Sequence, residues 1–261
     1  MITLLGGAGF IGSYVSDRLR RAGIEFQAPS RNEPLDGRDL GTVIYCIGIT
    51  GDFRQRALDT ADAHVSSLVE LIRHSRFESL LYVSSVRLYL RTRGLAREDD
   101  PFLLNPLDTD DIYNASKAAG EAITLSLGNR GRVARVANAY GQRQKHTFLA
   151  EILNEARRGE IRLRSSPETA RDYIHVEDVA DLLVRIALDG RERIYNVASG
   201  ISLTNAEVCE LIARLTASRV SVIPDAPAVL FPRIDTTRIR RDFGFAPRLL
   251  ADELPRIIAA P

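Results

Sequence analysis

The 261-residue chain lacks three features that would point to particular classes of protein. No apolar run approaches the ~20 residues that a membrane-spanning helix needs, so no transmembrane segment is expected. Neither sign of charge is in excess, because 35 Lys and Arg residues stand against 34 Asp and Glu residues, which indicates no nucleic-acid or membrane partner. The two cysteines, Cys46 and Cys209, lie in apolar surroundings without metal-ligand spacing, so we expect reduced core residues and no metal site.

No internal repeat or low-complexity linker is seen in the sequence. An apolar strand begins at the first residues, with no basic region and cleavage site before it, so we expect a cytoplasmic protein. The length suffices for one α/β domain and a small second lobe.

The alternation of apolar strands with amphipathic helices indicates an α/β fold with a parallel, doubly wound sheet. Strands are predicted near residues 2–5, 24–28, 42–47, 79–84 and 131–137, and helices near 10–22, 58–75 and 111–128. Beyond residue 141 the pattern is more charged and broken, with helices predicted near 146–158, 177–188, 204–216 and 250–259.

A glycine-rich turn joins the first predicted strand to the first helix. Residues 6–12 fit both the Gly-x-Gly-x-x-Gly and the Gly-x-x-Gly-x-x-Gly spacing. Glycine lets the backbone turn tightly and approach a phosphate without a Cβ in the way, and a helix N-terminus attracts anions. The pattern predicts a dinucleotide site, although a tight turn without a ligand is the alternative. The expected cofactor contacts are Gly6, Gly9, Phe10, Ile11 and Gly12.

Tyr113 and Lys117 lie four residues apart in the third predicted helix, so their side chains project from the same face. A free phenol has a pKa near ~10 and is a poor base at neutral pH. A lysine held close by favours the phenolate, which makes the tyrosine a candidate for proton transfer. Two such residues can also share a solvated helix face by chance.

The strand near 79–84 ends in two hydroxyl side chains, Ser84 and Ser85. Ligands bind at the carboxyl ends of the strands in a doubly wound sheet. A serine there can hydrogen-bond the carbonyl or alcohol oxygen on which the tyrosine acts, or it can cap the next segment.

Five motifs in this order resemble the extended short-chain dehydrogenase/reductase family of NAD(P)-dependent nucleotide-sugar epimerases, dehydratases and reductases. They are the glycine turn, residues 82–85, Tyr113 with Lys117, residues 135–141 and residues 171–180. The resemblance implies a Rossmann-type sheet in residues 1–141, to which later segments return. It implies a small, interleaved C-terminal substrate lobe formed mainly by residues 142–261.

The resemblance also implies roles for individual residues. Ser85, Tyr113 and Lys117 match the catalytic residues, and Tyr113 and Lys117 also contact the cofactor. Ser85 is chosen over Ser84 because it precedes Tyr89 by four positions, the spacing that the family shows.

The second predicted strand is followed by Ser30 and Arg31 rather than by an acidic residue. An acid at this position of a dinucleotide fold bonds the adenosine ribose, whereas an arginine accommodates a 2′-phosphate. We therefore favour NADP(H) over NAD(H), the alternative being that Glu33 or Asp36 reaches the ribose.

The chain departs from the family where residues 31–41 run almost directly into the next strand, so the sheet is expected to lack one strand–helix unit. In this shortened segment, Asp39 and Leu40 are the expected adenine contact. His64 stands where the family has an asparagine that supports the lysine through solvent, and a histidine without chemistry is an equal alternative.

Asn138 and Arg171 are the expected substrate contacts, because matching residues of the family face the nucleotide diphosphate. A guanidinium can contact phosphate oxygens in a bidentate way. The alternative for Arg171 is a salt bridge to Asp172 or Asp178. His175 and Asp178 are expected to fix a turn and cap the next helix.

Three further residues, Lys145, His146 and Thr147, could line the same cleft. A late arginine of the family has no clear counterpart, and Arg233 is the nearest.

The two residues directly after the catalytic hydroxyl partly restrict the reaction type. Dehydratases of this family place an acid and a base there, whereas this chain has Val86 and Arg87, so dehydration is not expected. We predict an epimerase or ketoreductase that acts on a nucleotide-linked sugar at C4, by Tyr-mediated proton transfer and hydride transfer to or from nicotinamide. The alternatives are a reductase of a small non-nucleotide carbonyl in secondary metabolism and a non-catalytic NAD(P)-binding sensor.

A homodimer is expected from the resemblance, because relatives pair through two helices that match residues 58–75 and 111–128. Both helices carry apolar stripes, although such stripes are also needed to cover a sheet.

Overall fold

A six-stranded parallel sheet forms the centre of the structure, a computed structural model that describes residues 1–31, 33–145, 147–223, 226, 228–229 and 231–259. Its strands are β1 (Ile2–Leu5), β2 (Phe26–Gln27), β3 (Thr42–Tyr45), β4 (Ser79–Ser85), β6 (Gly131–Val136) and β10 (Ile194–Val197). The strand order is β10-β6-β4-β3-β1-β2, so the sheet grows in opposite directions from β1. The predicted α/β fold with a doubly wound parallel sheet is confirmed.

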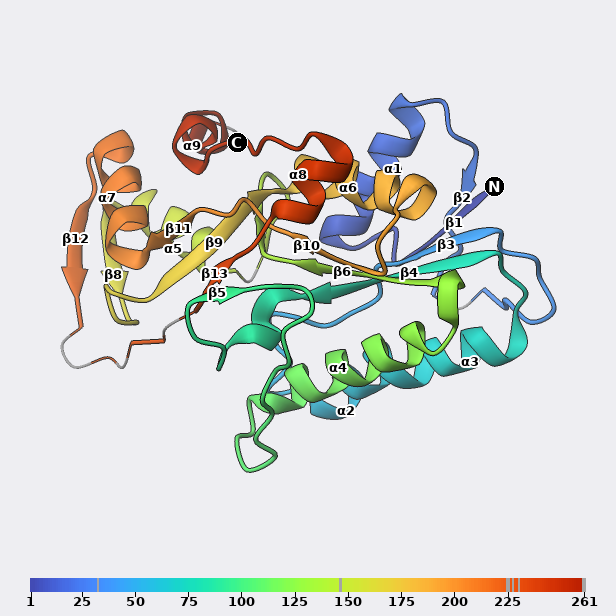
Figure 1. Ribbon diagram of the computed structural model, residues 1–261. Coiled ribbons are helices and arrows are strands. Elements are labelled where there is room, and N and C mark those ends of the chain that lie inside the picture. The colour runs from blue at the N-terminus through green and yellow to red at the C-terminus, as the bar shows by residue number, and fades with distance from the viewer. Residues whose placement is uncertain (32, 146, 224–225, 227, 230, 260–261) are drawn as a thin grey trace.

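Helices cover both faces of this sheet (Figure 1). One face carries α1 (Phe10–Arg21), α6 (Val176–Asp189) and α8 (Thr237–Phe243). The other carries α2 (Ala57–Ala61), the π-helical turn η1 (Asp62–Ser66), α3 (Ser67–His74) and α4 (Asp111–Leu125). The single helix predicted near 58–75 is thus divided by a π-helical turn. Among the described residues, no helix has the length and apolar character needed to cross a bilayer.

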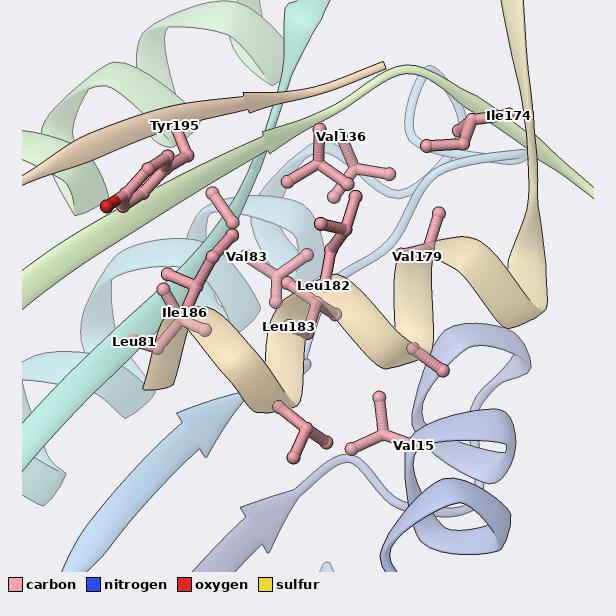
Figure 2. Packing of buried hydrophobic residues seen from close by; sticks show 14 of the residues in the cluster. Val15, Leu81, Val83, Val136, Ile174, Val179, Leu182, Leu183, Ile186 and Tyr195 are labelled. Carbon is pink, nitrogen blue, oxygen red and sulfur yellow. The ribbon is translucent and has the colours of Figure 1, made fainter. Parts of the chain in front are cut away.

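Both faces of the central strands are apolar, as expected for a parallel sheet whose successive side chains point to opposite sides. On β4, Leu81 and Val83 belong to the cluster under α6, whereas Leu80 and Tyr82 belong to the cluster on the α3 side. Figure 2 shows side chains of α6 lying against the sheet, with Val15 of α1 beside the helix; the labelled contacts are Val179, Leu182, Leu183, Ile186, Leu81, Val83 and Val136.

A smaller lobe lies beside the large sheet and has its own apolar cluster (Figure 1). Its helices are α5 (Phe148–Ala156), α7 (Asn205–Thr216) and α9 (Leu250–Ala259). Its strands are β7 (Asn138–Tyr140), β9 (Ala170–His175) and β11 (Ser202–Thr204) in one sheet, and β8 (Glu160–Leu163) with β12 (Arg219–Val222) in another. Two short strands, β5 (Leu95–Ala96) and β13 (Arg233–Ile234), pair with each other. The turns η2 (Val86–Tyr89) and η3 (Gly128–Arg130) follow β4 and α4.

The later half of the chain also contributes to the large sheet, since β10 forms one of its edges and α6 packs across it. Between β2 and β3, the described residues form no strand or helix and make only one isolated bridge, from Asp39 to Arg76. The large sheet therefore passes from β2 to β3 through an irregular segment.

A buried ion pair ties α4 to the sheet. The Arg135 guanidinium on β6 donates to the Glu121 carboxylate on α4, with Nε–Oε1 at 3.0 Å and Nη2–Oε2 at 2.7 Å. The guanidinium also lies over the rings of Tyr89 and Phe102, and both partners of the pair are less than 5% exposed. The helix that carries Tyr113 and Lys117 is anchored at this point.

Glu121→Ala is expected to lower the free energy of unfolding by about 3–5 kcal/mol, because it leaves the Arg135 charge buried without its partner. The matched control is Glu210→Ala, which removes an exposed pair with Arg214 on α7 and should cost less than about 1 kcal/mol. Urea unfolding of the three proteins measures both differences. Equal losses in the two variants would contradict the anchoring role of the buried pair.

Candidate active site

The turn after β1 requires glycine at two positions. Gly6 has a φ of +80°, in the left-handed region that favours glycine. A Cβ on Gly6 would lie 2.9 Å from the backbone carbonyl of Cys46, and a Cβ on Gly12 would lie 2.1 Å from the Gly6 oxygen. The backbone is therefore packed tightly enough to bring the N-terminus of α1 to the ends of β1 and β3.

The N-terminus of α1 offers unpaired donors. Gly9 precedes its first turn, where no side chain caps the helix and no acidic residue is present. The first N–H groups of a helix have no partner within it, and the helix dipole favours an anion there. This cradle fits the pyrophosphate of a dinucleotide. Gly9, Phe10, Ile11 and Gly12 line the adjoining cleft, whereas Gly6 shapes the turn beneath it.

The cleft has a volume of about 400 Å³ and lies at the carboxyl ends of β3, β4 and β6. It brings together most of the residues that the sequence singled out: Gly9, Phe10, Ile11, Gly12, Ser85, Tyr113, Lys117, Asn138 and Arg171. Its described lining contains no Asp or Glu, and its cationic residues are Arg87, Lys117, Lys145 and Arg171. A cavity of about 630 Å³ between α1 and α9 contains none of the predicted site residues.

Tyr113 and Ser85 meet within this cleft. Tyr113 is only 5% exposed, and it lines the cleft together with Ser85 at the end of β4. Burial raises the pKa of the Tyr113 phenol, whereas the Ser85 hydroxyl, the Arg87 charge and the Thr50 hydroxyl act in the opposite direction. Ser85 Oγ also accepts a 3.1 Å hydrogen bond from the Arg87 backbone N–H. The phenol and the hydroxyl are close enough to share one substrate oxygen.

Lys117 is also 5% exposed, and its ammonium contacts the backbone of β4. Its Nζ donates a 2.8 Å hydrogen bond to the Val83 carbonyl and lies 4.8 Å from the centre of the Tyr82 ring. Burial lowers the pKa of Lys117 to about 7. Arg87 is a cation that opposes the burial-raised pKa of Tyr113, and the expected effect of Lys117 on the phenol stays a prediction.

His64 lies in the π-helical turn and packs beside Tyr113. Its Nδ1 is 2.8 Å from Ser116 Oγ, and its Nε2 accepts a 3.4 Å hydrogen bond from the Ile49 N–H. Because Ser116 Oγ donates to the Tyr113 carbonyl, the proton of the imidazole belongs on Nδ1. Burial, together with the nearby Lys117, lowers the pKa of His64 to about 2. The ring is therefore neutral, and it packs edge-on against Tyr113 at 5.3 Å.

Asn138 and Arg171 line the cleft from the side of the smaller lobe. Asn138 donates a 2.9 Å hydrogen bond to the Asp172 carbonyl. Arg171 donates to Asn205 Oδ1 at 2.7 Å and lies over the rings of Phe148 and Phe231. The alternative of a salt bridge for Arg171 is not found among the described residues.

Some of the other predicted residues lie in the cleft and some lie outside it. Lys145 and Thr147 line the cleft, and Thr147 also caps α5, while His146 lies outside the described residues. Arg233 lies on β13 and is not part of the cleft lining. His175 caps α6 by accepting from the Glu177 N–H, as predicted.

Ser30 and Arg31 follow β2, close to the glycine turn, and both are exposed outside the cleft. Glu33 is engaged within the same loop, because its carboxylate accepts from the Ser30 N–H at 3.2 Å and from Arg38 at 2.6 Å. The described part of the chain provides no hydrogen bond or ion pair for the Arg31 side chain.

Asp39 and Leu40 do not lie where an adenine contact requires. They precede β3, so they are at the amino end of the strand, opposite the glycine turn. Leu40 is fully buried, and its N–H donates to the Arg76 carbonyl at 2.8 Å. The predicted adenine contact is wrong, because the shortened segment places this pair before a strand rather than after one.

Several residues of the cleft were not singled out from the sequence as site residues. Thr50 and Phe53 follow β3, and Phe53 packs on the Tyr113 ring at 5.3 Å. In the sequence, only their position after a buried strand pointed to Thr50 and Phe53. Nothing in the sequence pointed to Phe231, which also lines the cleft. Cys46, expected in the core, is half-buried and lines the cleft, whereas Cys209 is buried as predicted.

The fold and the cleft define a Rossmann-type dinucleotide-binding protein. The model of the NAD dependent epimerase/dehydratase family matches residues 2–198, so the chain belongs to this family. The chain is 30% identical to a dTDP-glucose 4,6-dehydratase of Streptomyces griseus over 78% of its own length, but spans only 62% of that relative. It is 27% identical to a GDP-6-deoxy-D-mannose reductase of Pseudomonas aeruginosa, covering 90% of this chain and 86% of that one.

A solved structure of RMD from Pseudomonas aeruginosa, complexed with NADPH, has a similar fold. Its TM-score is 0.79 at 21% identity, and the match covers 99% of this chain and 97% of that one.

Lys117→Met is expected to raise the free energy of unfolding at pH 7. The unfolded lysine binds a proton up to pH ~10.4, whereas the buried amine loses it near pH 7, so the cost of Lys117 grows as the pH falls through this window. The advantage of the variant over the wild type should therefore shrink from pH 7 to 9, by at most about 1.4 kcal/mol per pH unit. Urea unfolding at three pH values measures it.

His64→Asn provides the control for this pH dependence. The folded pKa of about 2 places the cost of His64 below pH ~6.5, so its difference from the wild type should stay constant between pH 7 and 9. A constant difference for Lys117→Met would mean that its amine is not held with a lowered pKa.

Proposed function

We propose that the protein is an NAD(P)-dependent epimerase or ketoreductase acting on a nucleotide-linked sugar at C4. The observation that supports this most is the shared cleft, in which Tyr113 and Ser85 meet beside the N-terminus of α1. The names of the relatives refer to dTDP- and GDP-sugars, which does not favour a small non-nucleotide carbonyl or a sensor without turnover.

Several residues of the cleft have a role in the proposed reaction. Tyr113 takes the proton from the carbinol oxygen during oxidation or returns it during reduction, and Ser85 holds that oxygen by a hydrogen bond. A bound nicotinamide would supply the acceptor or donor of the hydride at the same carbon. The α1 N-terminus would hold the pyrophosphate, and Lys117 the nicotinamide ribose. Asn138 and Arg171 would face the nucleotide diphosphate of the substrate.

Dehydration is disfavoured in this proposal, although a relative is named as a dehydratase. Elimination of water needs an acid and a base next to the oxidised carbon. Val86 is apolar, and Arg87 stays protonated, so neither can form that pair.

NADP(H) is the proposed cofactor. Arg31 is exposed beside the glycine turn and is available for a 2′-phosphate, whereas Glu33 is held by Arg38 and Ser30 and is less available for a ribose hydroxyl. The RMD structure contains NADPH, which is compatible with this choice.

The proposed organisation assigns residues 1–141 to cofactor binding and residues 142–261 mainly to the substrate. A homodimer would bury the half-exposed side chains of Val65, Val69 and Ile72 together with Ala118 and Ala122 of α4.

Tyr113→Phe is expected to reduce turnover of the nucleotide sugar by at least about 100-fold, because the proton acceptor is removed while the ring packing stays. The matched control is Tyr195→Phe, which removes another hydrogen-bonded phenol outside the cleft and should leave kcat within about threefold. UDP-, dTDP- and GDP-sugars are incubated with NADP(H) or NAD(H) and the products separated. Equal turnover by the two variants would exclude Tyr113 as the proton-transfer group.

Arg31→Ala is expected to weaken NADP(H) binding by about tenfold and to leave NAD(H) binding nearly unchanged, because only NADP(H) carries the 2′-phosphate. Calorimetry of both cofactors with both proteins measures the change, and NAD(H) serves as the internal control. Tighter NAD(H) than NADP(H) binding by the wild type would reverse the assignment.

A further inference from the structure

Arg87 lies at the reacting end of the cleft. It is the second residue of η2 and lies two positions after Ser85, and its backbone N–H donates to Ser85 Oγ. Its guanidinium lies 5.5 Å from the centre of the Phe53 ring, which in turn packs on Tyr113. Arg87 is therefore a cation of the cleft that acts on the Tyr113 phenol.

The Arg87 guanidinium has few partners among the described residues. Within the described part of the chain, no hydrogen bond leaves its side chain, and its Nε is buried without a partner. The nearest anion is Asp110, at 3.5 Å from Nη2, but Asp110 is already bound by Arg54, whose Nε lies 2.6 Å from Oδ1. Two guanidinium groups thus share this carboxylate, and Asp111, which also acts on the Arg87 charge, is bound by Arg91. Arg87 therefore has no carboxylate of its own.

The rest of the cleft does not neutralise this charge, because its described lining contains no carboxylate. Arg171 and Lys145 come from the segment after residue 138, and Arg171 is stacked on Phe148 and Phe231 of that side. Arg171 is suited to a substrate diphosphate, and the α1 N-terminus to the cofactor pyrophosphate. An anion that complements Arg87 must therefore belong to the reacting sugar itself.

We propose that Arg87 binds a carboxylate at C6 of the sugar, so that the substrate is a nucleotide-linked uronic acid; this rests on the proposed function. When the C4 oxygen lies between Tyr113 and Ser85, C6 is two bonds away from the reacting carbon. A planar guanidinium matches a carboxylate in a bidentate way, and it would fill donors that a neutral hydroxymethyl group leaves largely unpaired. Substrates without the carboxylate are disfavoured for the same reason.

The test compares sugars that differ only at C6. The pairs are UDP-glucuronate with UDP-glucose, dTDP-glucuronate with dTDP-glucose, and GDP-mannuronate with GDP-mannose. For each pair, kcat/KM is measured with NADP(H) or NAD(H), and Kd by calorimetry with the cofactor present. The wild type is expected to prefer the uronate of one pair by at least about 100-fold.

Arg87→Met should lower this preference by about 10- to 100-fold, and Arg87→Lys should lower it less, because lysine keeps the charge but loses the bidentate contact. The ratio is the readout, since a merely structural defect would reduce both sugars of a pair together.

Three results would overturn the inference or its basis. If the wild type uses the neutral sugar as well as its uronate, the inferred binding of a C6 carboxylate is wrong, but the proposed function stands. A loss in Arg87→Met that is equal for both sugars assigns Arg87 to the phenol instead of the substrate. Absence of turnover and of binding for all six nucleotide sugars removes the proposed function itself.

Discussion

The buried pairing of Glu121 with Arg135 holds α4 against β6, and the geometry of the cleft depends on that helix. Parallel strands end at one edge of the sheet, so Ser85 at the end of β4 has a position fixed by the sheet. Tyr113 belongs to the helix above, and its hydroxyl can meet Ser85 only if the helix is held in register. An ion pair with both partners nearly solvent-free supplies this registry, because a shifted helix would leave two charges buried and unpaired.

The same exclusion of water sets the electrostatics of the cleft. Burial lowers the pKa of Lys117 to about 7 and, with Lys117 nearby, that of His64 to about 2, so the amine titrates near neutrality while the imidazole stays neutral. A neutral imidazole can hold the Ile49 backbone and pack against Tyr113 without adding a third charge to a crowded site. The histidine thus has a positioning role that the asparagine of the family pattern did not suggest. The buried amine of Lys117 lowers the stability of the folded protein at neutral pH, because burial disfavours its charge.

The sequence was sufficient to predict five of the six strands of the large sheet, all except β10, and most of the cleft, for reasons visible in single elements. β1, β3, β4 and β6 are apolar on both faces, and the glycine turn has a spacing that few other structures need. The strands of the smaller lobe were missed because they are short and partly exposed, as β12 illustrates. Asp39 and Leu40 were misplaced because a local pair of residues does not reveal whether it precedes or follows a strand. The orientation of Lys117 toward Val83 depends on tertiary contacts that helical spacing alone cannot specify.

Arg87 connects these observations to specificity. The position that provides acid–base chemistry in a dehydratase is occupied here by a side chain that cannot release its proton at physiological pH. Retaining a charge there has a cost, since its surroundings are largely desolvated and its ion-pair partner Asp110 is shared with Arg54. A group placed at such a cost beside a reacting carbon is most simply accounted for by a ligand that neutralises it. Removing dehydratase chemistry and selecting an acidic sugar would then be two consequences of the same substitution.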